Sequence, residues 1–107
     1  MRVTGWNNGS HHPNGSGYGL RVSKADRDRL FNPRWRIVIL NLEDDQAVIV
    51  PVAPSFWRGC TELRSRDIGR WLIKRSLAPW PRGKPPLLIM EQVVANQFVV
   101  SPIPLRT

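Results

Sequence analysis

The sequence is poor in cysteine, with Cys60 as the single one among 107 residues. One cysteine excludes an intramolecular disulfide and any zinc site built from several thiolates. The neighbours Phe56, Trp57 and Leu63 are apolar, so we expect a buried thiol that behaves as a small hydrophobic side chain. The sequence therefore predicts neither a disulfide framework nor a metal site.

Long hydrophobic runs are also absent. The longest apolar stretch is far shorter than the roughly 20 residues that a helix needs to cross a membrane. The first residues, Met1 to Asn8, contain no apolar core of a secretory signal peptide. We therefore expect a cytoplasmic protein with no membrane partner.

Acidic residues and lysines are scarce. Lys and Arg together number 16 against 8 Asp and Glu, the net charge is +8, and only three of the cations are lysines. The guanidinium of arginine is a planar fork that binds phosphates bidentately and stacks on bases. A genome rich in arginine codons would explain the preference for arginine, but not the excess of positive charge.

The composition nevertheless supports a packed core. Hydrophobic residues make up 41% of the chain and include five Trp, each of which can bury a large apolar area. This length suits one domain, so we expect a single basic domain over residues 1–107. Residues 1–17 are rich in Gly, Asn and Ser and predict a flexible N-terminal arm or loop, and residues 101–107 predict a frayed tail.

The hydrophobic pattern between these ends predicts mostly strands. Alternating and β-branched runs indicate strands at residues 18–22, 34–42, 47–52, 87–94 and 97–100. Ser23 followed by Asp26 resembles a capping box and predicts a helix at residues 24–31. A second helix is expected at residues 65–75, with Asp67 in its first turn and Lys74 and Arg75 in its last, as the helix macrodipole favours. We expect the hairpin of residues 34–52 to form the centre of the sheet. The fold class is mainly β (α+β), a small open β-barrel or sheet of about five to seven strands with two short helices.

The positive charge is concentrated in two segments. Residues 21–36 carry a net charge of +4 and residues 58–84 a net charge of +6, whereas residues 37–57 between them carry −3. If the two basic segments pack on one side, they form a surface that can follow the phosphates of a nucleic acid. The same pattern also fits two ordinary solvated helix faces.

We therefore expect phosphate contacts from eight cationic side chains: Arg21, Arg27, Arg29, Arg64, Arg66, Arg70, Lys74 and Arg75. Base recognition needs hydrogen-bonding groups besides cations. Four polar residues of the N-terminal arm could supply these groups, namely Asn7, Asn8, His12 and Asn14. The competing interpretation of that arm is a surface loop with no partner. Trp6 and Trp80 fall in expected loops and could stack on bases.

The sequence contains few residue patterns that could form a catalytic site. Adjacent His11 and His12 could serve as acid and base of a ribonuclease-type toxin, but no motif fixes their geometry. Asp26 and Asp28 are flanked by arginines, which favours local salt bridges over a magnesium site. The acidic-x-Lys motif of metal-dependent nucleases and the phosphate-binding loop signature are both missing. We expect no catalytic residue and no cofactor.

The order of elements resembles the DNA-binding pseudobarrel shared by plant transcription factors and the effector domains of some restriction endonucleases. The resemblance covers most of the chain and is carried by the sequence Gly17-Tyr-Gly-Leu-Arg-Val-Ser, by Leu30-Phe31, by strands 35–42 and 47–52, and by the closing strand ending at Phe98-Val-Val. It implies a seven-stranded open barrel that clamps the major groove between two arms. Since the pattern shows five strands, the other two would lie near Trp6 and in the proline-rich segment 77–86. No base-reading residue is carried over.

These observations favour a nucleic-acid-binding module, with DNA favoured over RNA, in a bacterial or phage defence or regulatory system. The second hypothesis is a small protein-interaction domain that docks an acidic partner, with Trp80 and the prolines as a rigid ledge. The third is the ribonuclease-type toxin. The sequence leaves the oligomeric state open.

Overall fold

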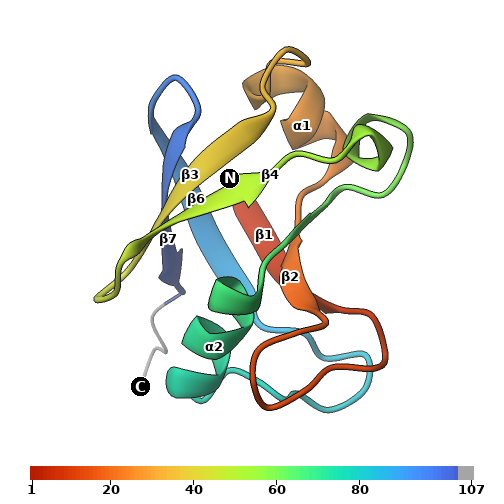
Figure 1. The fold of residues 1–107 in the computed structure, drawn as a ribbon, viewed down its shortest axis with the longest axis vertical. Helices are drawn as coiled ribbons and strands as arrows, with labels where there is room; N and C mark the ends of the chain where they lie inside the picture. The colour runs from red at the N-terminus through yellow and green to blue at the C-terminus, as the bar shows by residue number, and fades with distance from the viewer. Residues whose placement is uncertain (104–107) are drawn as a thin grey trace.

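The computed structural model describes residues 1–103, and its centre is one seven-stranded sheet that curls into an open barrel (Figure 1). The strand order across the sheet is β4-β3-β7-β6-β1-β2-β5. The strands are β1 (Arg2–Asn7), β2 (Tyr18–Arg21), β3 (Ile37–Leu42), β4 (Ala47–Pro51), β5 (Glu62–Arg64), β6 (Leu87–Val94) and β7 (Gln97–Pro102). Two α-helices, α1 (Lys24–Leu30) and α2 (Arg66–Lys74), and one 3₁₀ turn, η1 (Pro54–Trp57), complete the fold. The predicted fold class is confirmed.

The β3–β4 hairpin, which the sequence predicted at the centre of the sheet, lies at one edge of it. β3 pairs with β4 on one side and, in parallel, with β7 on the other, where Ile39 lies opposite Gln97. The C-terminal hairpin β6–β7 therefore occupies the middle of the sheet, and β4 becomes an edge strand. The expectation of a central β3–β4 hairpin was wrong, because local alternation gives no information about this long-range parallel pairing.

Strand alternation builds the core as the pattern predicts. Along β3, Val38, Leu40 and Leu42 are buried, while the residues between them face outward. Aromatic rings close one end of the barrel, where Phe31 stacks on Phe98 with ring centroids 5.1 Å apart. Twenty hydrophobic residues of the described chain are buried in this single core, and their removal from water is the main stabilising contribution.

Helix α2 covers the opposite end of the barrel. Ser65 caps it by accepting a hydrogen bond from the Asp67 amide at 3.1 Å, which agrees with the predicted helix start. Its inward residues are buried, and the indole Nε1 of Trp71 donates a 3.0 Å hydrogen bond to the Glu43 carbonyl in the β3–β4 turn. The helix is thereby attached to the edge hairpin (Figure 1).

Two strands were not predicted. The first is β1, which lies in the expected N-terminal arm and in which buried Val3 and Gly5 alternate with less buried residues. The second is β5, which directly precedes α2. The resemblance placed the two additional strands near Trp6 and in the proline-rich segment. The first location is correct, whereas the second strand is Glu62–Arg64.

Two local expectations also need correction. Cys60 is exposed, because it lies in the β4–β5 connection outside the core. Ser101 and Pro102 belong to β7, so the expected frayed tail is ordered there, and residues 104–107 lie outside the described residues. No helix within residues 1–103 has the length and apolar character to cross a membrane.

Candidate nucleic-acid interface

Two long loops project from the same side of the barrel (Figure 1). The first, residues 8–17, connects β1 to β2; the second, residues 52–61, connects β4 to β5 and contains η1. Strands β2 and β5 are hydrogen-bonded neighbours at the open edge of the sheet, between the bases of the two loops. The side chains of these strands are therefore presented between two protrusions.

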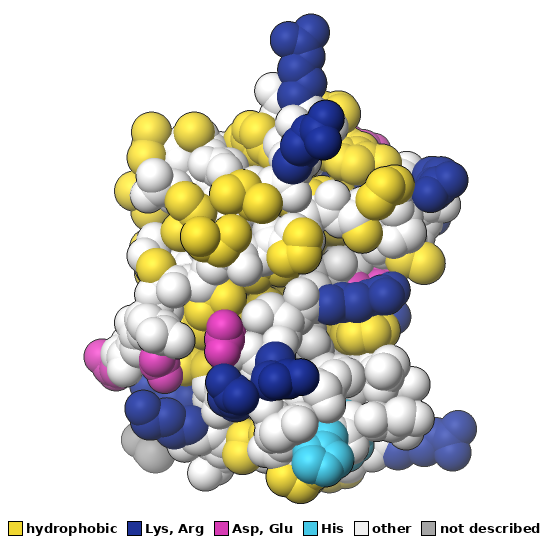
Figure 2. All heavy atoms as spheres, viewed as in Figure 1, with side chains coloured by type: hydrophobic (Ala, Val, Ile, Leu, Met, Phe, Trp, Pro, Cys, Tyr) yellow, Lys and Arg dark blue, Asp and Glu magenta, His cyan; other side chains and the backbone are white. Residues whose placement is uncertain are grey.

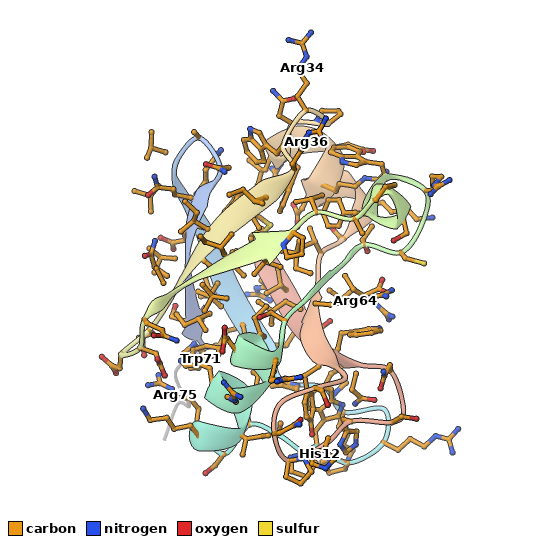
Figure 3. The ribbon with its side chains drawn as sticks, in the orientation of Figure 1. His12, Arg34, Arg36, Arg64, Trp71 and Arg75 are labelled. Atoms are coloured by element: carbon orange, nitrogen blue, oxygen red, sulfur yellow. The ribbon has the colours of Figure 1, made fainter. Side chains whose placement is uncertain are left out.

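An arginine stacked on a tryptophan marks this surface. The Arg64 guanidinium carbon lies 4.9 Å from the Trp6 ring centroid, and 55% of the Arg64 side chain remains exposed. Figure 3 shows Arg64 extending from β5 toward the side on which the loops project. A guanidinium held on an indole ring keeps its outer N–H groups available to an anion.

A carboxylate beneath the surface positions two arginines. The Glu62 side chain is only 8% exposed and lies 3.3 Å from the Arg64 guanidinium and 3.9 Å from that of Arg21. Both arginines remain more than half exposed. One negative charge thus faces two positive charges, which leaves the outer surface cationic.

A groove of about 450 Å³ lies beside this pair. Its walls come from the first loop, from β1 and from the junction of β5 with α2, and its lining residues are Trp6, Asn8, Ser16, Gly17, Tyr18, Arg64, Ser65 and Arg66. Arg66 has no carboxylate of the described residues within 4.0 Å. The groove therefore combines an aromatic face, exposed cations and neutral polar groups.

The first loop is folded upon itself by its own polar side chains. The Oδ1 atoms of Asn7, Asn8 and Asn14 each accept a backbone N–H two residues ahead, at 2.8–3.0 Å. The His12 Nδ1 accepts the Asn14 amide at 3.1 Å. The predicted flexible arm is therefore a β-strand followed by a structured loop. Of the four predicted base-reading residues, Asn7 ends the strand, and Asn8, His12 and Asn14 lie in the loop.

The loop is also fixed to its surroundings. Arg70 of α2 donates from Nε to the Asn14 carbonyl at 3.1 Å. The hydroxyl of buried Tyr18 lies 3.0 Å from His11 Nδ1, and burial raises the pKa of Tyr18 above its ordinary value of 10.0. These contacts hold the loop over the groove.

Five of the eight predicted phosphate contacts are engaged with acidic side chains away from this groove. Arg27 is only 11% exposed, donates to the Phe56 carbonyl at 3.0 Å and packs over Trp57, so its role is structural. The other four pair across the helix surfaces or with the β3–β4 turn: Arg29 with Asp26, Arg70 with Asp67, Lys74 with Asp45, and Arg75 with Glu43 and Asp44. Arg21, Arg64 and Arg66 remain on the groove side.

The two basic segments meet only through their strands. Helices α1 and α2 lie at opposite ends of the barrel, so their outward faces do not form one continuous surface (Figure 1). Strands β2 and β5, one from each segment, are neighbours, with Arg21 opposite Glu62 and Gly19 opposite Arg64. The shared cationic surface is therefore smaller than the charge distribution predicted.

Other cations without a carboxylate partner surround the barrel. Within residues 1–103, eight cations have no carboxylate within 4.0 Å. They are Arg2, Lys24, Arg34, Arg36, Arg58, Arg66, Arg82 and Lys84. Arg58 belongs to the second loop, and Arg82 lines a hollow with Asn7 at the end of β1 and His11 of the first loop. Figure 2 shows Lys and Arg side chains at several heights along the side from which the loops project.

The alternative site residues do not assemble a reaction centre. His11 contacts Tyr18 and His12 contacts its own loop, and Asp26 and Asp28 pair with arginines. Among residues 1–103 no group of three or more His, Cys, Asp or Glu side chains could hold a metal ion. Trp80 is half-buried against the core, with its ring centroid 5.6 Å from that of Tyr18, so it does not form a free ledge.

Sequence reasoning missed the two strands that assemble this surface. Trp6 was assigned to a loop and Glu62 to the approach of a helix, whereas the two residues lie on strands that flank β2. The sequence signal that could have identified β5 is the apolar Leu63 between the charged Glu62 and Arg64, which is the alternation of a strand with one buried face.

Comparison of the chain with protein-family models, with curated proteins and with solved structures gives no match. The resemblance to the DNA-binding pseudobarrel thus stays a prediction, although seven strands is the number that it implies.

Proposed function

We propose that the chain is a cytoplasmic DNA-binding module that holds the phosphate backbone on the surface of β2 and β5, between its two projecting loops. The observation that carries the proposal is the Arg64–Trp6 stack, in which an exposed guanidinium is oriented by an indole and by the buried Glu62 carboxylate. Preorganised guanidinium groups bind phosphates with less loss of side-chain entropy.

The two loops favour duplex DNA over duplex RNA. The major groove of B-form DNA is about 12 Å wide and admits protein elements, whereas that of A-form RNA is too narrow for side chains to read. Loops that project from one side of a cationic surface can enter neighbouring parts of a wide groove while the strands between them contact phosphates (Figure 1).

Base recognition is assigned to the first loop. Asn8 and Asn14 are exposed and use Oδ1 to close turns of the loop. This arrangement directs the amide NH₂ group of each side chain to other acceptors, and base edges in the major groove offer N7, O6 and O4 acceptors. Trp6 and Tyr18 form the aromatic part of the groove beneath this loop.

The proposal is tested by fluorescence anisotropy with the whole chain and labelled duplex DNA, single-stranded DNA and duplex RNA at fixed salt. We expect the tightest binding to duplex DNA and a loss of about tenfold for Arg64→Ala, since a charged contact contributes about 1–3 kcal/mol. Lys74→Ala is the matched control, because Lys74 is exposed but pairs with Asp45 away from the groove.

An acidic protein partner would use the same charges, so polyaspartate serves as a competitor of similar charge without bases. Displacement of duplex DNA by polyaspartate at an equal concentration of charges would contradict a nucleic-acid site. Equal binding of DNA by the Arg64→Ala and Lys74→Ala variants would contradict the assignment of the groove.

A further inference from the structure

The outward side of β3, β4, β6 and β7 carries an apolar patch, on strands other than the β2 and β5 of the proposed DNA surface. Strand alternation turns Ile49 and Ile39 outward, and the register shift between Gln92 and Val94 brings Val94 into the same row across four strands, with Gln97 of β7 between Ile39 and Val94. Ile49 is 66% exposed and Val94 is 58% exposed. Here we define the apolar patch as Ile37, Ile39, Ile49, Pro51, Val94 and Val99.

The patch has the composition of an interface rather than of a solvated face. Glu91 is the one charged residue among the sequences of β3, β4, β6 and β7. In a typical antiparallel sheet with one solvated face, polar side chains alternate with the buried ones. Figure 2 shows hydrophobic side chains gathered over the β3–β4 end of the molecule. A contiguous exposed apolar area of this kind indicates a surface that another protein covers.

The edge position of β4 has the same implication. β4 is the first strand of the sheet, and its outward side chains are Ala47, Ile49 and Pro51. Proteins usually protect such an edge with charged side chains, bulges or a covering segment. Pro51 is the single such feature within β4, and β5 approaches this edge where the barrel nearly closes, so the edge is only partly covered.

The charges at the two ends of the β3–β4 hairpin indicate which partner binds the apolar patch. Arg34 and Arg36 precede β3 and have no carboxylate of the described residues within 4.0 Å, whereas Glu43, Asp44 and Asp45 follow it in the β3–β4 turn. Figure 3 shows Arg34 and Arg36 at one end of the molecule, far from Arg75, which binds the acidic turn. Arg75 pairs with Glu43 and Asp44, and Lys74 pairs with Asp45, so the three carboxylates of the turn face two cations of the same chain. The β3–β4 hairpin thus has a positive end and a weakly negative end, about 20 Å apart for a strand of this length.

We propose that the apolar patch binds a second copy of this chain in a two-fold symmetric dimer with antiparallel β3–β4 hairpins. A two-fold axis that lies in the interface, perpendicular to the strands, places the acidic turn of each copy near Arg34 and Arg36 of the other. An axis along the strands would place like charges together. The self-complementary charges and the apolar centre therefore select one arrangement.

The proposal is tested by sedimentation equilibrium of the full chain over a wide range of concentrations. We expect a mass of twice 12.3 kDa at the higher concentrations. Ile49→Asp and Val94→Asp each place a charge in the apolar centre and should weaken dimerisation at least tenfold. The matched control is Leu87→Asp, because Leu87 is 51% exposed but lies seven residues from Val94 along β6, opposite Thr4 of β1.

Circular dichroism and thermal melting show whether each variant remains folded, and only folded variants are compared. The orientation is tested by Asp44→Arg and Arg36→Glu, which should each weaken the dimer, whereas the double variant should recover most of the affinity. A single species of 12.3 kDa at every concentration would overturn the proposal. Dimerisation of folded Ile49→Asp and Val94→Asp with the affinity of the original chain would overturn it too.

Discussion

Gly15 in the β1–β2 loop and Gly69 in helix α2 pack backbone against backbone. A Cβ atom at position 69 would lie 2.7 Å from the Gly15 Cα, closer than side-chain carbons approach one another. Gly15 adopts a φ of +96°, which favours glycine, and its own missing Cβ makes room for the backbone of Arg70. Together with the Arg70–Asn14 hydrogen bond, this contact fixes the loop that covers the groove.

The first prediction concerns Gly69→Ala. In the middle of an ordinary helix this change stabilises by about 1 kcal/mol, because alanine is the better helix former. Here the added methyl group must displace the loop, so we expect a net loss of about 1–3 kcal/mol in the free energy of unfolding. Urea denaturation measures the loss, and duplex DNA affinity should fall as the loop moves. Lys74→Ala in the same helix is the control and should change stability by about 0.5 kcal/mol or less. Stabilisation by Gly69→Ala would show that the loop does not pack on α2.

The second prediction concerns the ionisation of Tyr18. Burial raises the pKa of the folded-state phenol above 10.0, so above about pH 10 the unfolded chain binds fewer protons than the folded one. Stability from this group is therefore complete below pH 10 and is lost as pH rises through the folded-state pKa. Tyr18→Phe should lower stability by about 0.5–1.5 kcal/mol at pH 7, where the bond to His11 is lost. Urea denaturation at pH 7 and pH 11 should show a smaller alkaline loss for the variant, and parallel losses would refute the assignment.

The third prediction concerns Cys60. Because the thiol is exposed, a disulfide-exchange reagent should label the native protein rapidly and with one equivalent. Addition of urea should change the labelling rate only by the small factor expected for an already accessible group. Labelling that requires unfolding would mean that the thiol is buried, as its apolar neighbours in the sequence suggested.

Much of the fold followed from local patterns. Alternation predicted β2, β3, β4, β6 and β7, and Ser23 predicted the start of α1, where it accepts the expected hydrogen bond. The charges at its two ends predicted α2, which Ser65 caps in the same way. These elements depend on interactions within a few residues, so the sequence contains their signal directly. The barrel order depends on pairings such as Ile39 with Gln97, which local patterns do not report.

The site was harder to predict for the same reason. Arginine enrichment drew attention to Arg21 and Arg64, which are more than half exposed, but did not distinguish them from Arg27, whose side chain is buried against Trp57 and the Phe56 carbonyl. Formal charge counts every arginine equally, whereas the ability to bind phosphate depends on exposure and on nearby carboxylates. The sequence suggested Trp6 as a stacking residue, but its contact with Arg64 depends on β1 and β5 lying on either side of β2, which local patterns do not report.

The most direct test is the dependence of DNA affinity on salt concentration. Each phosphate contact releases bound counterions, so removal of one contact reduces the slope of log K against log salt by about one. We expect Arg64→Ala and Arg66→Ala to reduce the slope by about one each, and Lys74→Ala to leave it unchanged. Equal slopes for all three variants, or the loss of slope in Lys74→Ala alone, would contradict a DNA interface on the β2–β5 surface.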